Sequence, residues 1–159
     1  MTIEAVLQLR KEKKYTEAKN AMLQLLDVEQ NNAEYHYQMA WCYDNLGQER
    51  DAVPHYVQAI SLGLSLESLE GAYVGLGSTY RSLGQYAEAK ETLEAAILQF
   101  PNANQLKVFY VMTLYNLQEH SKAMEIVLKL LAESSHDESI VDYKQAILYY
   151  ADKLDEKWD

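Results

Sequence analysis

Four histidines and one cysteine are the residues best suited to metal binding or nucleophilic chemistry, and none falls in a recognisable motif. His36 and His55 could approach one another across a helical hairpin, with Asp51 nearby, but their spacing matches no zinc signature. Cys42 lies in a predicted helix between residues expected to be buried, where a free thiol behaves as a small apolar group. We therefore expect no metal site and no catalytic cysteine.

Signatures of cofactor binding and of hydrolytic catalysis are also missing. Gly75 and Gly77 hint at a nucleotide-binding loop, but no third glycine follows at the required position and no strand precedes them. Close packing of two helices explains both glycines better. The carboxylates are scattered over predicted helix surfaces instead of being paired in an apolar pocket, as acid–base catalysis requires. The sequence thus predicts a protein that is not an enzyme and has no cofactor.

The chain is acidic, with 24 acidic and 14 basic residues and a formal net charge of −10. Such a chain repels phosphate backbones, so nucleic-acid binding would need a dense local basic patch. The densest basic run is Arg10, Lys11, Lys13 and Lys14, and Glu12 interrupts it. We interpret this run as a solvated helix end, where cations also interact favourably with the helix dipole. No nucleic-acid partner is expected.

Cellular location can be predicted from what the 159 residues contain. No apolar run approaches the roughly 18 residues that a membrane span requires. The first 15 residues have no apolar signal core, and a single cysteine fits a reducing compartment. We expect a cytoplasmic protein with no membrane partner.

The elements that position the side chains are clearest between Tyr73 and Pro101, which read as two helices joined by a turn at Gly84. The helical period places one set of residues on the inner face of the first helix and another on that of the second. These residues are Tyr73, Leu76, Gly77 and Tyr80, followed by Ala89, Leu93 and Ala96. Small residues at Gly77 and Ala89 let the two helices pack closely.

The same unit recurs along the chain. A small residue opens each second helix at Ala18, Ala52, Ala89 and Ala123, at intervals of 34, 37 and 34 residues. In its residue types and in this period, the chain resembles the tetratricopeptide repeat over about residues 2–135. The histidines at 36 and 120 then stand at aromatic packing positions. The fourth unit departs from the pattern, because Lys107 replaces the first aromatic residue, Val111 the small residue and Gln118 the turn glycine.

The resemblance implies an all-α fold, namely a right-handed superhelix of four helix-turn-helix repeats plus a C-terminal capping helix. We expect one domain over residues 1–159, with repeats at about 2–30, 31–64, 66–101 and 102–135. Core positions of the fourth repeat would include Val127 and Leu131. The last segment carries apolar residues at helical spacing from Ile140 to Trp158, which predicts the capping helix over about 137–157. Solenoids need such a cap.

In tetratricopeptide repeats the first helices commonly line a concave groove that binds a partner peptide or helix. In the first unit the resemblance implies Ile3, Leu7 and Arg10 as groove residues. In the later units it implies Tyr37, Trp41, Asp44, Asn45, Val74, Ser78, Arg81, Val108, Met112, Tyr115 and Asn116. Small side chains near Gly71 would leave room for an inserted group. An apolar or amphipathic segment suits this lining better than a chaperone C-terminus, with Arg81 and Asn45 fixing its orientation.

Trp41 is the most informative groove residue, because tryptophan is enriched in binding hot spots. The alternative is that Tyr37 and Trp41 pack against neighbouring helices. We interpret the chain as a non-catalytic protein-interaction module, or scaffold, with a protein or peptide partner. Two alternatives stay open: a self-associating structural homodimer, formed through the groove or the apolar C-terminal helix, and a small chaperone of a secreted client.

Overall fold

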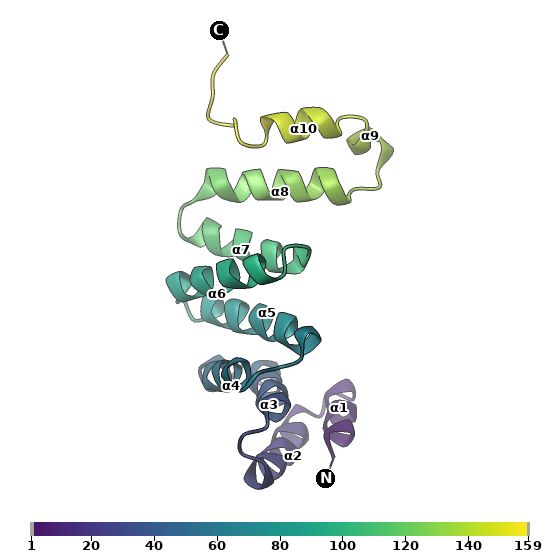
Figure 1. The fold of residues 1–159 in the computed structure, drawn as a ribbon, viewed down its shortest axis with the longest axis vertical. Helices are drawn as coiled ribbons and strands as arrows, with labels where there is room; N and C mark the ends of the chain where they lie inside the picture. Colours follow the sequence, from purple (N-terminus) through teal and green to yellow (C-terminus); the bar gives the residue numbers. More distant parts are fainter. Residues whose placement is uncertain (1, 159) are drawn as a thin grey trace. The chain divides into compact units, whose positions relative to one another are not determined.

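A computed structural model describes residues 2–158 and contains only helices and connecting turns in this range. The chain divides into two compact units, Met1–Thr92 and Leu93–Asp159, which are treated separately below. Figure 1 labels the helices in chain order. They are α1 (Ile3–Lys11), α2 (Tyr15–Val28), α3 (Ala33–Asn45), α4 (Glu49–Leu62), α5 (Leu66–Ser82), α6 (Tyr86–Gln99), α7 (Asn104–Asn116), α8 (His120–Ser134), α9 (Glu138–Val141) and α10 (Lys144–Tyr150). The all-α repeat fold predicted from the sequence is confirmed.

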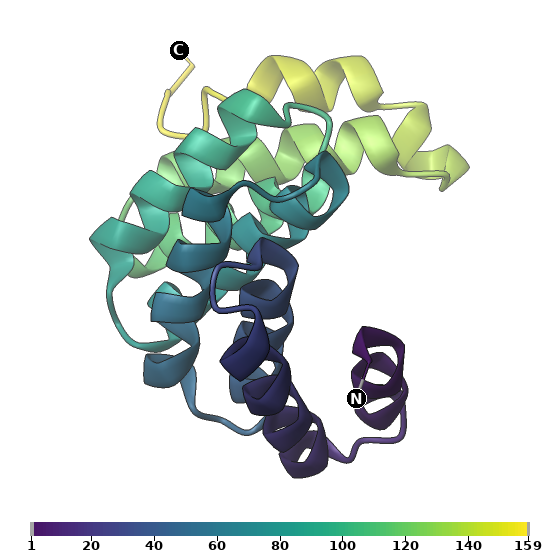
Figure 2. The same cartoon turned by 60° about the horizontal axis from the view of Figure 1, so that its bottom comes forward.

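In the first unit the helices follow one another as antiparallel hairpins. Figures 1 and 2 show α1 and α2 in purple, followed by α3 and α4 in blue. Each helix from α1 to α4 packs against the next one in the chain, and α3 also packs against α5. Side-chain caps start the first helix of each hairpin: Thr2 Oγ1 accepts from Ala5 N at 3.4 Å, and Asn32 Oδ1 accepts from Tyr35 N at 3.1 Å.

The hairpin turns share one backbone geometry, although only two of them contain glycine. Lys13, Gly47, Gly84 and Gln118 have φ values of 60°, 67°, 76° and 64°, all in the left-handed region. The residue after each donates its N–H back to the last turn of the preceding helix, as in Gln48 N to Tyr43 O at 3.0 Å and Glu119 N to Leu114 O at 2.9 Å. The turn at Gln118 is therefore kept despite the missing glycine.

The core of the first unit contains small residues where the helices approach closely. Ala18, Ala52 and Ala72 are fully buried, and Met22 and Met39 fill the space around them. Tyr37 of α3 and Tyr56 of α4 project onto Gly71 and Gly75 of α5. A Cβ at Gly75 would lie 2.4 Å from the Tyr56 ring, so the absence of a side chain there is what admits the ring.

In the second unit α8 lies between α7 and α10 (Figure 1). Leu106 and Leu114 of α7 are fully buried, and the Tyr110 hydroxyl donates to Glu94 at 2.5 Å. Val127 and Leu131 of α8, expected in the core, are 38% and 41% exposed, so that expectation is wrong. Ala132 is buried instead, because the face of α8 that packs inward is narrower than the apolar stripe of its sequence.

The C-terminal segment differs from the single helix expected over about 137–157. Asp137 caps the four-residue α9, and the chain bends at Tyr143, which bonds to Ile140 three residues back. Helix α10 then packs on α8, and Ala151 just beyond it is 1% exposed. The apolar spacing is helical throughout. Of the two short helices, α10 packs against α8, and packing supplies most of the stability of a short helix. No helix within residues 2–158 is both long enough and apolar enough to cross a membrane.

Candidate functional site

An exposed tryptophan on α3, held by an arginine from α1, marks the strongest candidate site in the first unit. The Trp41 side chain is 37% exposed. The guanidinium carbon of Arg10 lies 4.6 Å from the centre of the indole ring, which is within the range of a cation–π interaction. One turn further along α3, the Asn45 side chain donates to the Trp41 carbonyl oxygen at 2.6 Å. The contact with Arg10 therefore orients the Trp41 indole before any partner arrives.

Beside Trp41 is a cleft of about 280 Å³, which we call the α1–α3 cleft. Its lining comes from α1, the first residue of α2 and the end of α3. The lining residues are Leu7, Arg10, Lys11, Tyr15 and Asn45. No acidic residue is among them. The cleft thus combines an apolar side chain with basic and hydroxyl donors, in a chain that is acidic as a whole.

A chain of polar contacts holds Arg10 in place and joins three helices of the unit. The Arg10 guanidinium donates to the side-chain oxygen of Gln38. Gln38 Nε2 donates to Glu34 Oε1 at 2.7 Å, and the Ser68 hydroxyl donates to Glu34 Oε2 at 2.9 Å. Because these contacts link α1 to α3 and α3 to α5, they fix the first helices of successive repeats side by side.

Tyr37 was expected to be exposed in the groove but is only 8% exposed. Its ring packs edge-on against Trp41, at 6.4 Å between centroids, and tilts against Tyr56 at 6.3 Å. A Cβ built at Gly71 would lie 2.2 Å from the Tyr37 hydroxyl oxygen. The space that Gly71 was predicted to leave for a ligand is therefore occupied by Tyr37. Burial raises the pKa of the Tyr37 hydroxyl.

Asp44, another predicted groove residue, makes internal hydrogen bonds. It accepts from the Tyr56 hydroxyl at 2.6 Å and from Thr79 Oγ1 at 3.1 Å. Burial raises the pKa of its carboxyl group, and the two donors partly oppose that effect. Asp44 thus joins α3 to α4 and α5. Both carboxylate oxygens of Asp44 already accept internal hydrogen bonds.

The predicted groove residues on α5 are Val74, Ser78 and Arg81, and all three are half-buried. The Ser78 hydroxyl donates to the Gly75 carbonyl oxygen at 3.0 Å, within the same helix. On α5 the side chains at these positions therefore offer less surface than Trp41 offers on α3.

In the second unit α7 presents an apolar face of its own. Val108, Met112 and Tyr115 are 43%, 39% and 63% exposed, at helical steps of four and three residues. The Tyr115 ring lies 4.9 Å from the ring of His120, and Asn116 is half-buried. These are the residues that the sequence predicted for this helix.

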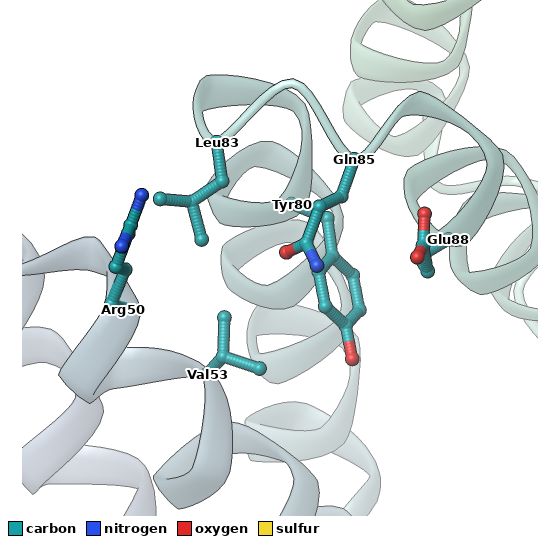
Figure 3. A pocket seen from close by; sticks show the side chains of 6 residues that line it. All are labelled: Arg50, Val53, Tyr80, Leu83, Gln85 and Glu88. Atoms are coloured by element: carbon teal, nitrogen blue, oxygen red, sulfur yellow. The ribbon is translucent and has the colours of Figure 1, made fainter.

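A second cleft in the first unit, of about 500 Å³, could not be predicted from the sequence. Figure 3 shows its side chains: Arg50 and Val53 come from α4, and Glu88 comes from the start of α6. Tyr80, Leu83 and Gln85 complete the lining. Burial, together with the charge of Glu88, raises the pKa of the Tyr80 hydroxyl, so this hydroxyl stays protonated near neutral pH.

The predicted approach of His36 to His55 across the helical hairpin is found. His36 Nδ1 and His55 Nδ1 lie 2.9 Å apart, and His36 Nε2 bonds to the Gln30 carbonyl oxygen at 2.9 Å. The His55 ring stacks on Tyr43 at 5.5 Å. Burial, helped by the neighbouring His36, lowers the pKa of His55 to about 4. Within residues 2–158 no three His, Cys, Asp or Glu side chains are placed to hold a metal ion.

Cys42 is fully buried, as its sequence position predicted. Burial raises the pKa of its thiol to about 11, which makes it unreactive near neutral pH.

Sequence reasoning missed Lys11 and Tyr15 as members of the candidate site. Lys11 was assigned to a solvated helix end, and Tyr15 was not among the predicted groove residues. The available signal was their spacing of four residues across the turn at Lys13, which brings the end of α1 and the start of α2 to the same cleft.

The paired helices and the shared turn geometry define a helical-repeat protein. Residues 33–154 match the tetratrico peptide repeat family, so the chain belongs to that family. Its structure is similar to the crystal structure of MamA, with a TM-score of 0.56 and 17% sequence identity, over 95% of this chain and 93% of that chain. No curated protein matches the chain. Family and fold support a role as a protein-interaction scaffold, and the family is in general non-catalytic.

Proposed function

We propose that the chain is a non-catalytic module that binds a segment of a partner protein on the first helices of its repeats, with Trp41 as the central contact. The observation that carries the proposal is the exposure of Trp41. A large aromatic side chain that is 37% exposed and makes a cation–π contact with Arg10 has the properties of a binding hot spot. Because Arg10 already holds the indole through a cation–π contact, less conformational entropy is lost on binding.

In the first unit the contact residues would be Trp41 and Asn45 of α3, with Leu7 and Arg10 of α1. Val74, Ser78 and Arg81 of α5 would contribute their partly exposed surfaces. Tyr37 and Asp44 would act indirectly, by holding α3 in place from inside. In the second unit the contact residues would be those of the exposed α7 face, Val108, Met112, Tyr115 and Asn116.

The test compares two tryptophans of this chain in the same capture experiment. Wild-type protein, Trp41→Ala and Trp158→Ala are each used to capture proteins from the native lysate, and the bound proteins are identified by mass spectrometry. Trp158 is the matched control because it is 60% exposed and lies in the second unit. We expect a reproducible partner that is lost with Trp41→Ala and kept with Trp158→Ala. Circular dichroism verifies that both variants stay helical.

A partner retained by folded Trp41→Ala at the wild-type level would contradict the proposal. So would a loss of equal size in both variants, because it would assign no special role to the indole of α3. A partner that depends on Trp41 and is also a secreted protein would favour the chaperone alternative within the same proposal.

Self-association is a second candidate, favoured by aromatic side chains gathered at the C-terminal end of the second unit. Tyr149, Tyr150 and Trp158 are about half exposed, and their ring centroids lie 5.0–6.4 Å apart. An exposed aromatic cluster of this kind is typical of an association surface. Sedimentation equilibrium at tens of micromolar distinguishes the candidates, because a homodimer would double the measured mass and Trp158→Ala would restore the monomer.

A further inference from the structure

We propose that the partner segment which docks in the α1–α3 cleft is acidic and amphipathic. In this arrangement an apolar side chain of the partner lies against Leu7 and Trp41, and a carboxylate beside it accepts from Lys11 and Tyr15. The inference rests on the proposed function, because it concerns the same surface. It adds the chemistry of the partner.

The charge distribution of the chain gives the first argument. Among the first 20 residues there are five basic and three acidic side chains, which leaves nine basic and 21 acidic side chains in the other 139. The cleft lies in this N-terminal part, with Arg10 and Lys11 in its lining and no acidic residue. A basic cleft on an acidic protein attracts anionic groups only at short range. It therefore favours a partner segment whose negative charge lies in the part that enters the cleft.

The hydrogen-bonding state of the lining gives the second argument. Within residues 2–158, neither the Lys11 ammonium nor the Tyr15 hydroxyl has an intramolecular hydrogen bond or ion pair. The nearest carboxylate in the sequence, Glu12, is already engaged: it pairs with Lys14 at 2.8 Å and accepts from Gln8 Nε2 at 2.8 Å. Glu12 therefore does not neutralise Lys11. Two donors at one cleft are left for an incoming acceptor, and a carboxylate forms the stronger, charge-assisted bonds.

Arg10 has a different role from Lys11. Its guanidinium is committed to Gln38 and to the Trp41 ring, and its Nε is buried without a hydrogen-bond partner. Arg10 thus contributes positive potential and support for the indole, and Lys11 provides the direct ionic contact. This division predicts that reversing the charge of Lys11 weakens binding without disturbing Trp41.

The apolar half of the partner follows from the remaining surface. Leu7 and Trp41 are each 37% exposed and flank the basic lining. A purely charged segment would leave this apolar surface in water, and a purely apolar segment would leave Lys11 desolvated and unpaired, which is costly. A segment with an apolar side chain next to a carboxylate satisfies both.

The experiment selects about 12-residue peptides from a random displayed library against the wild-type chain, a length suited to groove-binding segments. The dissociation constants of the enriched peptides are then measured by fluorescence anisotropy. Four proteins are compared: wild type, Trp41→Ala, Lys11→Glu and the matched control Lys157→Glu. Lys157 is exposed, lies outside the cleft, and gives the same change in net charge. We expect enriched peptides that are net negative and contain an apolar or aromatic residue.

For these peptides Lys11→Glu should weaken binding by about tenfold or more, and raised salt should weaken it further, whereas Lys157→Glu should change it by less than about twofold. Enrichment of neutral or basic peptides, or equal effects of Lys11→Glu and Lys157→Glu, would overturn the inference. If enriched peptides that are neutral or basic, or that respond equally to Lys11→Glu and Lys157→Glu, still lose binding in Trp41→Ala, the proposed function stands and only the proposed partner chemistry is wrong. Peptides that bind Trp41→Ala as well as wild type would refute both.

Discussion

The burial of Tyr37 against Gly71 leads to a prediction about a double substitution. A methyl group at Gly71 would place its carbon 2.2 Å from the Tyr37 hydroxyl oxygen and 3.3 Å from the ring carbon that carries it. The ring cannot swing away, because Trp41 and Tyr56 contact it and it is only 8% exposed. Gly71→Ala must therefore strain the α3–α5 contact as long as the hydroxyl is present.

Two opposing effects set the size of the change. Overpacking of a filled core costs about 1–3 kcal/mol. Replacing glycine by alanine inside a helix contributes about 1 kcal/mol of stability. In the wild-type background we therefore expect Gly71→Ala to lower the free energy of unfolding by about 1 kcal/mol. In a Tyr37→Phe background the oxygen at 2.2 Å is gone, so the same substitution should be neutral or stabilise by up to about 1 kcal/mol.

The assay is urea denaturation of four proteins: wild type, Gly71→Ala, Tyr37→Phe and the double variant, followed by circular dichroism. The expected result is a coupling free energy of about 1–3 kcal/mol, in which Tyr37→Phe rescues Gly71→Ala. Additivity within about 0.5 kcal/mol would refute the reasoning. It would mean that the hydroxyl of Tyr37 does not lie over Gly71 and that the space beside α5 is open to a ligand.

Three further predictions concern buried polar groups of the first unit. Because the pKa of His55 is lowered to about 4 from 6.5, folding stability should fall as pH drops from about 6.5 toward 4. Urea titrations should show a loss of about 1–2 kcal/mol in the free energy of unfolding, after allowance for solvent screening. The loss should be smaller in His55→Gln. Cys42, with its pKa raised to about 11 from 9.0, should react with a disulfide reagent at pH 8 about 100-fold more slowly than in urea, and equal rates would contradict its burial. Asp44→Ala should lower the free energy of unfolding by about 1–3 kcal/mol because it leaves the Tyr56 and Thr79 hydroxyls without their acceptor, and calorimetry showing an unchanged melting temperature would be inconsistent with those bonds.

The repeat pattern was sufficient to predict the helices and their turns, because both depend on local chemistry. The residues at 13 and 118 show how far this extends. Neither is glycine, yet each adopts the left-handed conformation that Gly47 and Gly84 adopt at the equivalent positions. The apolar faces on either side define the hairpin, so the backbone turns there despite the small strain of a side chain at positive φ. At these two turns the hairpin was predicted from the helical periodicity on either side, without a glycine in the turn.

Depth of burial was harder to predict than the face of a helix. Tyr37 and Trp41 are four residues apart and share one face of α3, so the sequence pattern treats them alike. The structure separates them, because Tyr37 is opposite a glycine on α5 and Trp41 is opposite Arg10 on α1. That distinction depends on contacts between residues about 30 positions apart in the chain. A single sequence does not specify such pairings.

The N-terminal helix connects the stability of the first unit to its proposed function. Helix α1 has nine residues, of which Val6 is fully buried and Ile3 and Leu9 pack partly buried against the same core, which includes Met39 and Cys42 of α3. The contacts of Arg10 with Gln38 and Trp41 add to this apolar packing in keeping α1 against α3. The same two helices form the walls of the α1–α3 cleft. Docking of α1 and completion of the cleft are thus one equilibrium, and a partner that binds in the cleft must stabilise α1 by mass action.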